Sequence, residues 1–442
     1  MRIREYVWAA TVGLVLADSS IVTLALPEIL RQFDATVFGV SWVLTTFNIV
    51  LAAAVLPAAR MARRLDARAV WAAGICVFAA ASLWCALSES IGVLIAGRCV
   101  QALGGAFVVS AAIELTAGTR GSHRAAAGVW GAAGVVGLAV GPAAGGLLTE
   151  LLSWEAIFVL QVPVVLALPA AFAPASRAVE AGPAGRLELA PEAALGLLSA
   201  GLTGALFLLV LLLIEGWRNT PLEAAAVVSV MPAATVGGAL IVRRFGHART
   251  VVASGAVLVG GGLAALGLLP DAAVGWTVPP QLLIGAGLAL ALPGLTQRAL
   301  SARDPQGERA AATVAARHAG IVVGLLVLTP IFTAELDSQH EAARLSGTAL
   351  LLDAPLSPGT KVDLAGEIAD QIEQADGRLP ELAPAFRRVE PEPGARRDLA
   401  RLAQDLEEEV DKAATHAFSN AFLAAAALAL AALAPILLGR RR

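Results

Sequence analysis

Two side chains of opposite charge stand inside long apolar runs and could together bind and release a proton. Asp18 lies in the run 16–22, and Arg98 lies in the run 96–101. A carboxylate beside a guanidinium is stabilised in its ionised form, whereas loss of that partner in apolar surroundings favours the protonated form. We therefore interpret the two residues as a proton switch. A static structural ion pair is the alternative.

The composition shows what kind of element must position these charges. The 442-residue chain is 57% hydrophobic and 15% charged, whereas an average globular chain is about 45–50% apolar and about 25% charged. The apolar residues form blocks of about twenty, enough to cross ~30 Å of hydrocarbon at ~1.5 Å per residue. These blocks are continuous rather than alternating, which excludes a membrane β-barrel. The sequence predicts an all-α, multi-pass membrane protein.

Other classes of protein are excluded or disfavoured by the same counts. A net charge of −3 disfavours a nucleic-acid binder, and we expect no nucleic-acid partner. A secreted disulfide scaffold is excluded because all three cysteines lie inside apolar blocks. We find no catalytic triad, nucleotide-binding glycine loop or metal cluster, so we expect no enzyme, no metal and no bound cofactor. The five histidines are scattered, and we expect ordinary surface or helix-end roles for them.

Twelve apolar stretches are candidate membrane spans, and we expect the first to be a retained helix rather than a cleaved signal peptide. They are 7–27, 38–57, 69–87, 91–116, 125–149, 155–173, 192–214, 221–242, 250–269, 275–296, 310–334 and 415–438.

The distribution of basic residues predicts the orientation. With the N-terminus inside, twenty arginines fall on inner segments, including Arg317 at the inner end of the eleventh span. The short outer loops hold only Arg31 and Arg218. Since positive residues favour the cytoplasmic side, we predict a protein of the cell membrane with both termini in the cytoplasm.

This layout places the two deep charges at one level. Counting ~1.5 Å per residue, Asp18 lies roughly 16 Å and Arg98 roughly 20 Å above the inner surface. The two can therefore touch if their helices adjoin. Other carboxylates that we considered, Glu114, Glu150 and Glu215, lie near helix ends. A deep charge is costly and normally faces a partner or a wet cavity, which favours the proton switch.

The fifth span combines a stripe of small residues with a helix-distorting proline. Gly137, Gly141 and Gly145 recur every four residues, which permits close helix packing. Pro142 removes a backbone donor and is expected to kink the helix. Gly146 completes a double glycine.

With these motifs the chain resembles the major facilitator superfamily, in its drug:proton antiporter branch. The run from Gly137 to Gly146 is similar to that branch's antiporter motif, and Arg98 with Gln101 is similar to its helix-four motif. The resemblance covers most of residues 10–335. The sequence is most similar to the fourteen-helix subgroup, although we count twelve helices. The resemblance implies two six-helix bundles, alternating access, and proton coupling through Asp18, Arg98 and Gln101.

Three departures from the family pattern stand out. In the loop after the second span, Arg63 occupies the position of an aspartate that family members use to close the inner gate. We assign this gate to Arg63, Arg64 and Asp66. Phe47 stands where a tyrosine is typical, and Gln161 where an asparagine is typical.

The predicted domains are an N-terminal bundle, a linker, a C-terminal bundle and an insertion outside the membrane. The insertion has a net charge of −9 and two helical stretches, 362–375 and 395–414, the second of which runs into the last span. We predict that helix twelve begins near 395, and we interpret the insertion as a docking post or conduit, or else as a structural cap. The boundaries are 1–173, 174–191, 192–334 with 415–442, and 335–414 for the insertion.

The predicted function is proton-driven export of amphipathic or hydrophobic small molecules. Asn48, Trp42 and Trp130 are candidate substrate contacts, and the proton is the expected coupling ion. The first alternative is export of a lipid or lipid-like molecule along the insertion. A non-transporting receptor or scaffold and an importing symporter are minor alternatives. Expected partners are membrane lipid, the transported substrate and an outer partner at 335–414.

Overall fold

The computed structural model is helical throughout the residues it describes. These are 2–120, 137, 140–172, 189–242, 248–300, 306–375, 382–389 and 395–439. The helices of the N-half are α1 (Arg2–Thr23), α2 (Leu26–Gln32), α3 (Val37–Arg64), α4 (Ala67–Ala86), α5 (Ile91–Arg120), an unlabelled helix over 140–151, α7 (Trp154–Val159) and the 3₁₀ helix η1 (Val162–Phe172).

The C-half continues from residue 189 through the end of the described chain. Its elements are α8 (Leu189–Leu211), the π-helical turn η2 (Leu212–Gly216), α9 (Pro221–Val228), α10 (Val230–Val242), α11 (Arg249–Leu266), α12 (Val274–Leu300), α13 (Gln306–Asp353), α14 (Pro358–Ala375), α15 (Ala383–Arg388), α16 (Arg396–Ala417), α17 (Ser419–Ala431) and α18 (Leu433–Leu438).

Local sequence explains where several of these helices begin. The Thr36 side chain accepts a hydrogen bond from the backbone of Gly39 and caps α3. Thr220 and Glu223 form a reciprocal capping box at the start of α9, where Pro221 occupies the first helical position. Both arrangements satisfy backbone N–H groups that have no partner within a helix.

Ten of the described helices are long and apolar enough to cross a membrane, which agrees with the predicted multi-pass fold. Of the other two predicted spans, 155–173 corresponds to a shorter apolar helix over Trp154–Ala170. The span 125–149 is described only at 137 and over 140–149, which are helical. Most of the predicted linker, from 174 to 188, lies outside the described residues.

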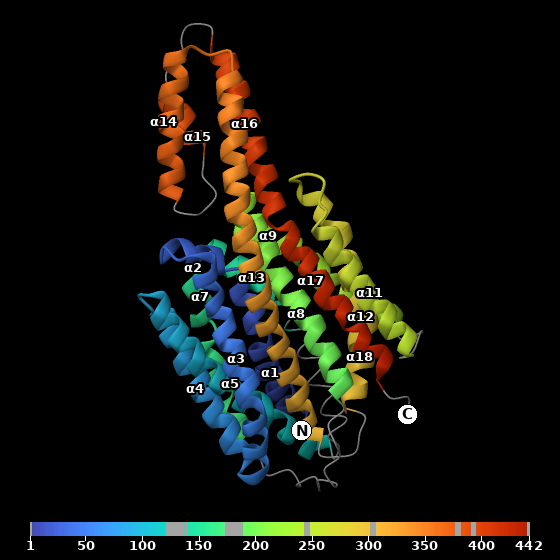
Figure 1. Ribbon diagram of the computed structural model, residues 1–442. Helices are drawn as coiled ribbons and strands as arrows, with labels where there is room; N and C mark the ends of the chain where they lie inside the picture. Colours follow the sequence, from blue (N-terminus) through green and yellow to red (C-terminus); the bar gives the residue numbers. More distant parts are fainter. Residues whose placement is uncertain are drawn as a thin grey trace.

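The helices form one elongated bundle with a projection at one end (Figure 1). α1 begins and α18 ends at the opposite end, which we call the terminal end; the other is the projection end. The two halves pack directly, since α3 of the N-half lies along α13 of the C-half. The core of the N-half accordingly includes Ala310, Ala311 and Val314 of α13.

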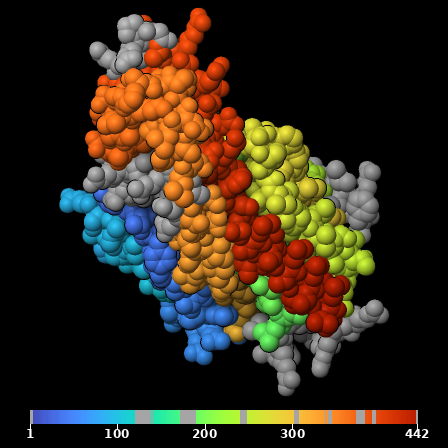
Figure 2. All heavy atoms as spheres, turned by 45° about the horizontal axis from the view of Figure 1, so that its top comes forward, coloured from blue at the N-terminus to red at the C-terminus, as the bar shows by residue number. Residues whose placement is uncertain are grey.

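The projection is built from two helices that continue out of the bundle. α13 runs unbroken for 48 residues, and α16 leads into α17 and α18. Figure 2 shows α13 and the α16–α17 segment side by side along one face of the molecule. The start of α16 at Arg396 lies at the predicted start of helix twelve. The extension of helix eleven was missed, because residues 335–353 are too polar to read as part of a span.

The projection has its own small apolar core. Leu351 of α13, Leu364 of α14 and Leu402 of α16 are buried together there, with six further buried apolar side chains. α15 packs against both α14 and α16. Amphipathic helices of this kind bury one stripe each against their neighbours, so the projection is a packed helical unit rather than an open loop.

Candidate proton-coupling site and contacts between the halves

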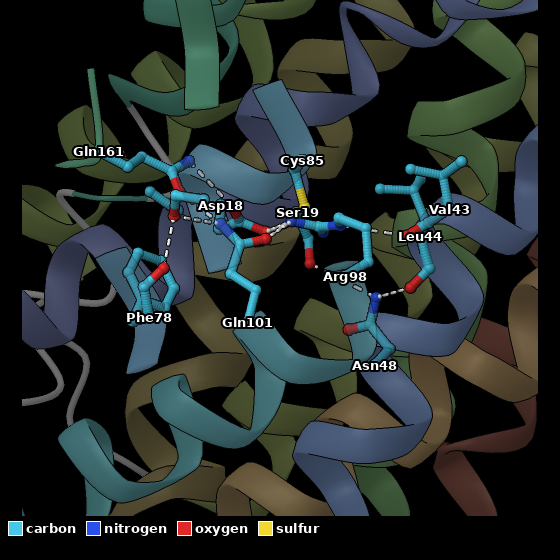
Figure 3. Close-up of polar contacts among 12 residues, drawn as sticks. Asp18, Ser19, Val43, Leu44, Asn48, Phe78, Cys85, Arg98, Gln101 and Gln161 are labelled. Carbon is cyan, nitrogen blue, oxygen red and sulfur yellow. Dashed lines mark hydrogen bonds and ion pairs between the residues drawn. The ribbon is translucent and has the colours of Figure 1, made fainter. Parts of the chain in front are cut away.

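The two deep charges of the N-half form a buried ion pair. Nη1 of Arg98 on α5 lies 2.5 Å from Oδ2 of Asp18 on α1, and neither side chain is exposed. Figure 3 shows this contact at the centre of a group of polar side chains. Since α1 and α5 pack together, the equal depths predicted from the helical rise become a direct contact. The contact is therefore confirmed, while its role in proton binding stays a prediction.

Two glutamines close a ring of hydrogen bonds around the ion pair. Arg98 Nη1 donates to Gln101 Oε1 at 2.6 Å, Gln101 Nε2 donates to Gln161 Oε1 at 2.7 Å, and Gln161 Nε2 donates to Asp18 Oδ1 at 2.9 Å. The Ser82 hydroxyl on α4 accepts from Gln101 at 2.8 Å. Three helices of the N-half and the turn between α7 and η1 thus hold the carboxylate in one geometry.

This geometry suits the ionised form of Asp18. Each carboxylate oxygen accepts a hydrogen bond, one from Arg98 and one from Gln161. An ionised carboxylate only accepts, whereas a protonated one carries an O–H donor. Protonation would remove the negative charge that attracts the Arg98 guanidinium and would therefore weaken the ion pair at the centre of the ring.

Aromatic side chains form much of the surroundings of the guanidinium. The Arg98 guanidinium carbon lies 4.1 Å from the centroid of the Phe47 ring and 5.7 Å from that of Phe158. Arg98 Nε donates to the Val43 carbonyl at 3.2 Å. Phe47, which replaces the typical tyrosine, supplies a ring face without a hydroxyl and thus a cation–π contact only. Among the described residues, Arg98 Nη2 has no hydrogen-bond partner.

The glycine stripe of the predicted fifth span lies against α1. A Cβ atom at Gly141 would collide with the Ser20 side chain, and Gly137 and Gly145 are similarly close to the α1 backbone. Pro142 is buried within the helix over 140–151. The contacts on α1 are made by Gly13, Ala17, Ser20 and Ile21. Because these residues flank Asp18, the stripe lets a second helix approach the proton site closely.

Gly146 instead faces the C-half. A Cβ atom at this position would collide with that of Ala225 and would lie 2.6 Å from the Pro221 carbonyl oxygen, both on α9. The halves therefore touch at the projection end through small residues. Arg31 and Glu215 add an ion pair of 3.6 Å at the same end.

A hydrogen bond joins the halves midway along α3 and α13. Nδ1 of the buried His318 lies 2.6 Å from Oδ1 of Asn48. Asn48 Nδ2 donates to the Leu44 carbonyl and contacts Ser19, beside Asp18 (Figure 3). Since the Asn48 oxygen accepts, His318 Nδ1 is the donor. The expectation of a surface or helix-end role for this histidine is wrong, because periodicity does not reveal that α13 faces α3.

The predicted gate residues have different partners. Nη1 of Arg63, at the end of α3, lies 2.5 Å from Oε1 of Glu308 in the first turn of α13. Asp66 instead accepts hydrogen bonds from the backbone and side chain of Arg68 in its own loop. These bonds, the side-chain one above all, lower the pKa of Asp66 below its ordinary value. Arg64 makes no ion pair with any residue whose placement is described. Of the three predicted gate residues, Arg63 is thus the one that forms an ion pair with the C-half among the described residues.

Further buried charges lie on the C-half. Glu192, a buried carboxylate in the first turn of α8, accepts a hydrogen bond of 3.0 Å from Thr313 and lies near Arg309. Of the other predicted substrate contacts, Trp42 is half-buried with its ring against Phe38. Trp130 lies outside the described residues. Within the described ranges there is no group of three potential metal ligands.

The fold and the buried polar site define a multi-pass helical membrane protein. The sequence profile of the Major Facilitator Superfamily matches residues 8–326, so the chain belongs to this superfamily. A solved structure with a similar fold is a bacterial homologue of the human lysosomal transporter Spinster in an inward-facing and occupied conformation. It aligns with a TM-score of 0.64 and 16% identity over 98% of this chain and 96% of that chain.

Curated relatives match about a third of the chain. They include a tetracenomycin C resistance and export protein of Streptomyces glaucescens, 35% identical over 36% of this chain and 30% of its own. A methylenomycin A resistance protein of Bacillus subtilis is 31% identical over 33% of this chain and 32% of its own. The multidrug resistance protein Stp of Mycobacterium tuberculosis is 35% identical over 34% and 29%, respectively. These matches are consistent with the drug:proton antiporter branch and indicate a transporter rather than an enzyme.

Proposed function

We propose that the chain is a proton-coupled exporter of amphipathic or hydrophobic small molecules that works by alternating access. The observation that carries the proposal is the buried Asp18–Arg98 contact, closed into a ring by Gln101 and Gln161. The names of the relatives, which refer to drug resistance and export, support the same conclusion. The superfamily fold supports movement of two halves around a central site.

The ring suggests how a proton drives the cycle. Because Arg98 and Gln161 stabilise Asp18 as a carboxylate, movement of either donor away from it favours the protonated form. Movement of α5 relative to α1 therefore controls protonation, and protonation in turn releases Arg98. The two conformations of the protein then differ in their affinity for a proton at Asp18. Proton binding shifts the equilibrium toward the conformation that binds the proton more tightly. In this scheme the glycine stripe provides the close contact along which the helix over 140–151 shifts against α1.

Orientation and gating follow from the positive-inside rule. We place the terminal end in the cytoplasm of the cell and the projection outside, with the Arg63–Glu308 contact as the cytoplasmic gate. Substrate contacts are assigned to Asn48, Trp42 and Trp130. The partners in this proposal are membrane lipid, the exported molecule and, at the projection, an outer partner. The lipid-export alternative has no support from the relatives named above.

The test uses the purified full-length chain in liposomes with an imposed proton gradient. Nile red, ethidium and anilinonaphthalene sulfonate serve as neutral, cationic and anionic probes. Wild-type protein should move at least one probe in a gradient-dependent manner. Asp18→Asn should reduce this transport about 100-fold while the protein still exchanges probe across the membrane, because the neutral amide cannot bind the proton.

Glu89→Gln is the matched control, since it removes an exposed carboxylate in the turn between α4 and α5. It should transport like wild type. Full gradient-dependent transport by Asp18→Asn would falsify proton coupling at this site. Absence of gradient-dependent transport by wild type with every probe would contradict the proposed function itself.

A further inference from the structure

A second deep arginine lies on the C-half, facing the interior. Arg317 is eleven positions beyond Gln306, the first residue of α13, or ~16 Å along the helix. Its neighbour His318 contacts Asn48, which in turn contacts the residue after Asp18. Arg317 therefore lies close to the level of the Asp18–Arg98 pair, and not at the edge of the membrane as the span boundaries had indicated.

Helical periodicity shows which way Arg317 faces. The residues three and four positions away, which share its face of α13, are all buried: Thr313, Val314, Gly320 and Ile321. The exposed face of the same stretch carries Ala319, Val323 and Leu326 instead. Arg317 itself is half-buried. The guanidinium thus belongs to the interior of the bundle and not to the lipid-facing side.

Arg317 has no partner anywhere in the described part of the chain. Other buried charges do have partners: Asp18 pairs with Arg98, and Glu192 accepts a hydrogen bond from Thr313 near Arg309. A charge held away from water without a counter-charge is costly, and at membrane depth such residues face a partner or a substrate path. Since no described side chain supplies this counter-charge, the transported molecule is the candidate partner.

The sign of the residual charge identifies the partner's chemistry. Asp18 and Arg98 cancel, so among the described residues at this level Arg317 leaves one uncompensated positive charge. Arg98 Nη2 is a further buried donor with no partner among the described residues. A guanidinium prefers planar oxyanions, which it binds through two parallel hydrogen bonds. One bound oxyanion would bring the charge of this region to zero.

We propose that Arg317 is the anion-binding residue of the substrate site, and that the cargo is an amphipathic molecule with one carboxylate, sulfonate or phosphate-type group. This inference rests on the proposed export function and narrows its substrate class. His318 supplies a second donor: its Nδ1–H, now taken by Asn48, becomes free when α3 and α13 separate. The apolar part of the cargo then lies among the buried aliphatic side chains beside Arg317, such as Val314 and Ile321.

The same three probes in proteoliposomes test the charge preference. With both probes at the same concentration, the wild-type protein should export anilinonaphthalene sulfonate at least tenfold faster than ethidium. Arg317→Gln should lose this preference, with a tenfold or greater loss for the anion and little change for Nile red. Arg317→Lys should retain part of the anion transport. Arg60→Gln, which removes an exposed arginine at the end of α3, is the matched control and should behave like wild type.

A binding measurement keeps the test independent of transport. The anionic probe should raise the Tm of the wild-type protein, because a ligand of the folded state stabilises it, and should leave the Tm of Arg317→Gln unchanged. Without probe, Arg317→Gln should be at least as stable as wild type, since it removes an unpaired charge.

Two results overturn the inference. One is gradient-driven export of ethidium or Nile red but not of anilinonaphthalene sulfonate. This result would contradict the anion preference and leave the proposed export function intact. The other is an equal anion-induced Tm rise in wild type and Arg317→Gln. Gradient-dependent transport of no probe at all contradicts the export function, and the inference about its cargo then falls with it.

Discussion

Two ion pairs in this chain have the same 2.5 Å contact between an arginine nitrogen and a carboxylate oxygen, but different surroundings. Asp18–Arg98 lies within the N-half and is fully buried, with both partners held by further hydrogen bonds. Arg63–Glu308 joins the two halves at the terminal end, and its side chains are 32% and 30% exposed. One pair is locked inside a bundle, and the other lies across the surface where the bundles must separate.

The difference in exposure indicates different roles. A pair that water reaches can break and re-form at little cost, because solvent replaces the lost contact. That property suits a gate that opens in every cycle. A buried ion pair is costly to break and often adds little net stability. Stability alone therefore does not explain why the chain has two charged residues at this buried position. In the proposed function the reason is proton binding by Asp18.

The largest expected effect is therefore on the buried pair. Arg98→Leu alone should lower the free energy of unfolding by about 3–5 kcal/mol, because it leaves the Asp18 charge buried without its counter-charge. The double variant Asp18→Leu with Arg98→Leu should recover most of this loss and still show no gradient-dependent transport. Denaturant unfolding in detergent measures the first quantity, and proteoliposome transport the second. A double variant as unstable as the single one would show that the pair serves stability.

The second-largest effect on transport is expected at the projection end. There the closest contact between the two halves is made by small residues and not by an ion pair. Gly146→Val should slow transport tenfold or more and widen this end, since a side chain there overlaps Ala225 and the Pro221 backbone. Overpacking of this kind costs about 1–3 kcal/mol. Spin labels at the exposed Leu151 and Leu222 should report a longer distance in the variant.

The control for this substitution is a glycine with free space around it. A Cβ atom at Gly237 on α10 would meet nothing within 4 Å. Gly237→Val should therefore leave both the spin-label distance and the transport rate unchanged. Equal slowing by both substitutions would show that the effect comes from the branched residue in the helix and not from the contact between the halves.

These contacts also show what could be predicted from sequence. The helical spans follow from hydropathy, because backbone polar groups in lipid must be satisfied within helices. The Asp18–Arg98 contact was predictable because the helical rise per residue is constant. The pairing of Arg63 with Glu308 was not, since nothing in the sequence fixes the register of α3 against α13. The depth of Arg317 was not predictable for a related reason: α13 extends beyond the predicted span at both ends and hides its boundaries.

A smaller effect is expected at the ion pair between the halves. Arg63→Glu places like charges together and should slow gradient-dependent transport by up to about fivefold, in line with the ~1 kcal/mol upper range of exposed pairs. Combining it with Glu308→Arg should restore the rate. Arg64→Glu makes the same charge change one residue away, and Glu308→Arg should not rescue it. The difference between Arg63→Glu and wild type should shrink in high salt; a salt-independent defect would argue against an electrostatic gate.

The smallest effect is expected at Asp66, whose exposed pair with Arg68 lies within a single loop. Its pKa is lowered below the ordinary value of 3.8, chiefly by the hydrogen bond from the Arg68 side chain. A lowered carboxyl pKa stabilises the fold at higher pH, and this contribution disappears as the pH falls through the lowered value. Asp66→Asn should therefore be slightly less stable than wild type at pH 7 and equal to it once Asp66 is protonated, below pH 3.8. Transport should be unchanged at pH 7, because Asp66 does not contact the C-half among the described residues. A transport loss as large as that of Arg63→Glu would show that the gate includes this loop in addition to the Arg63–Glu308 pair.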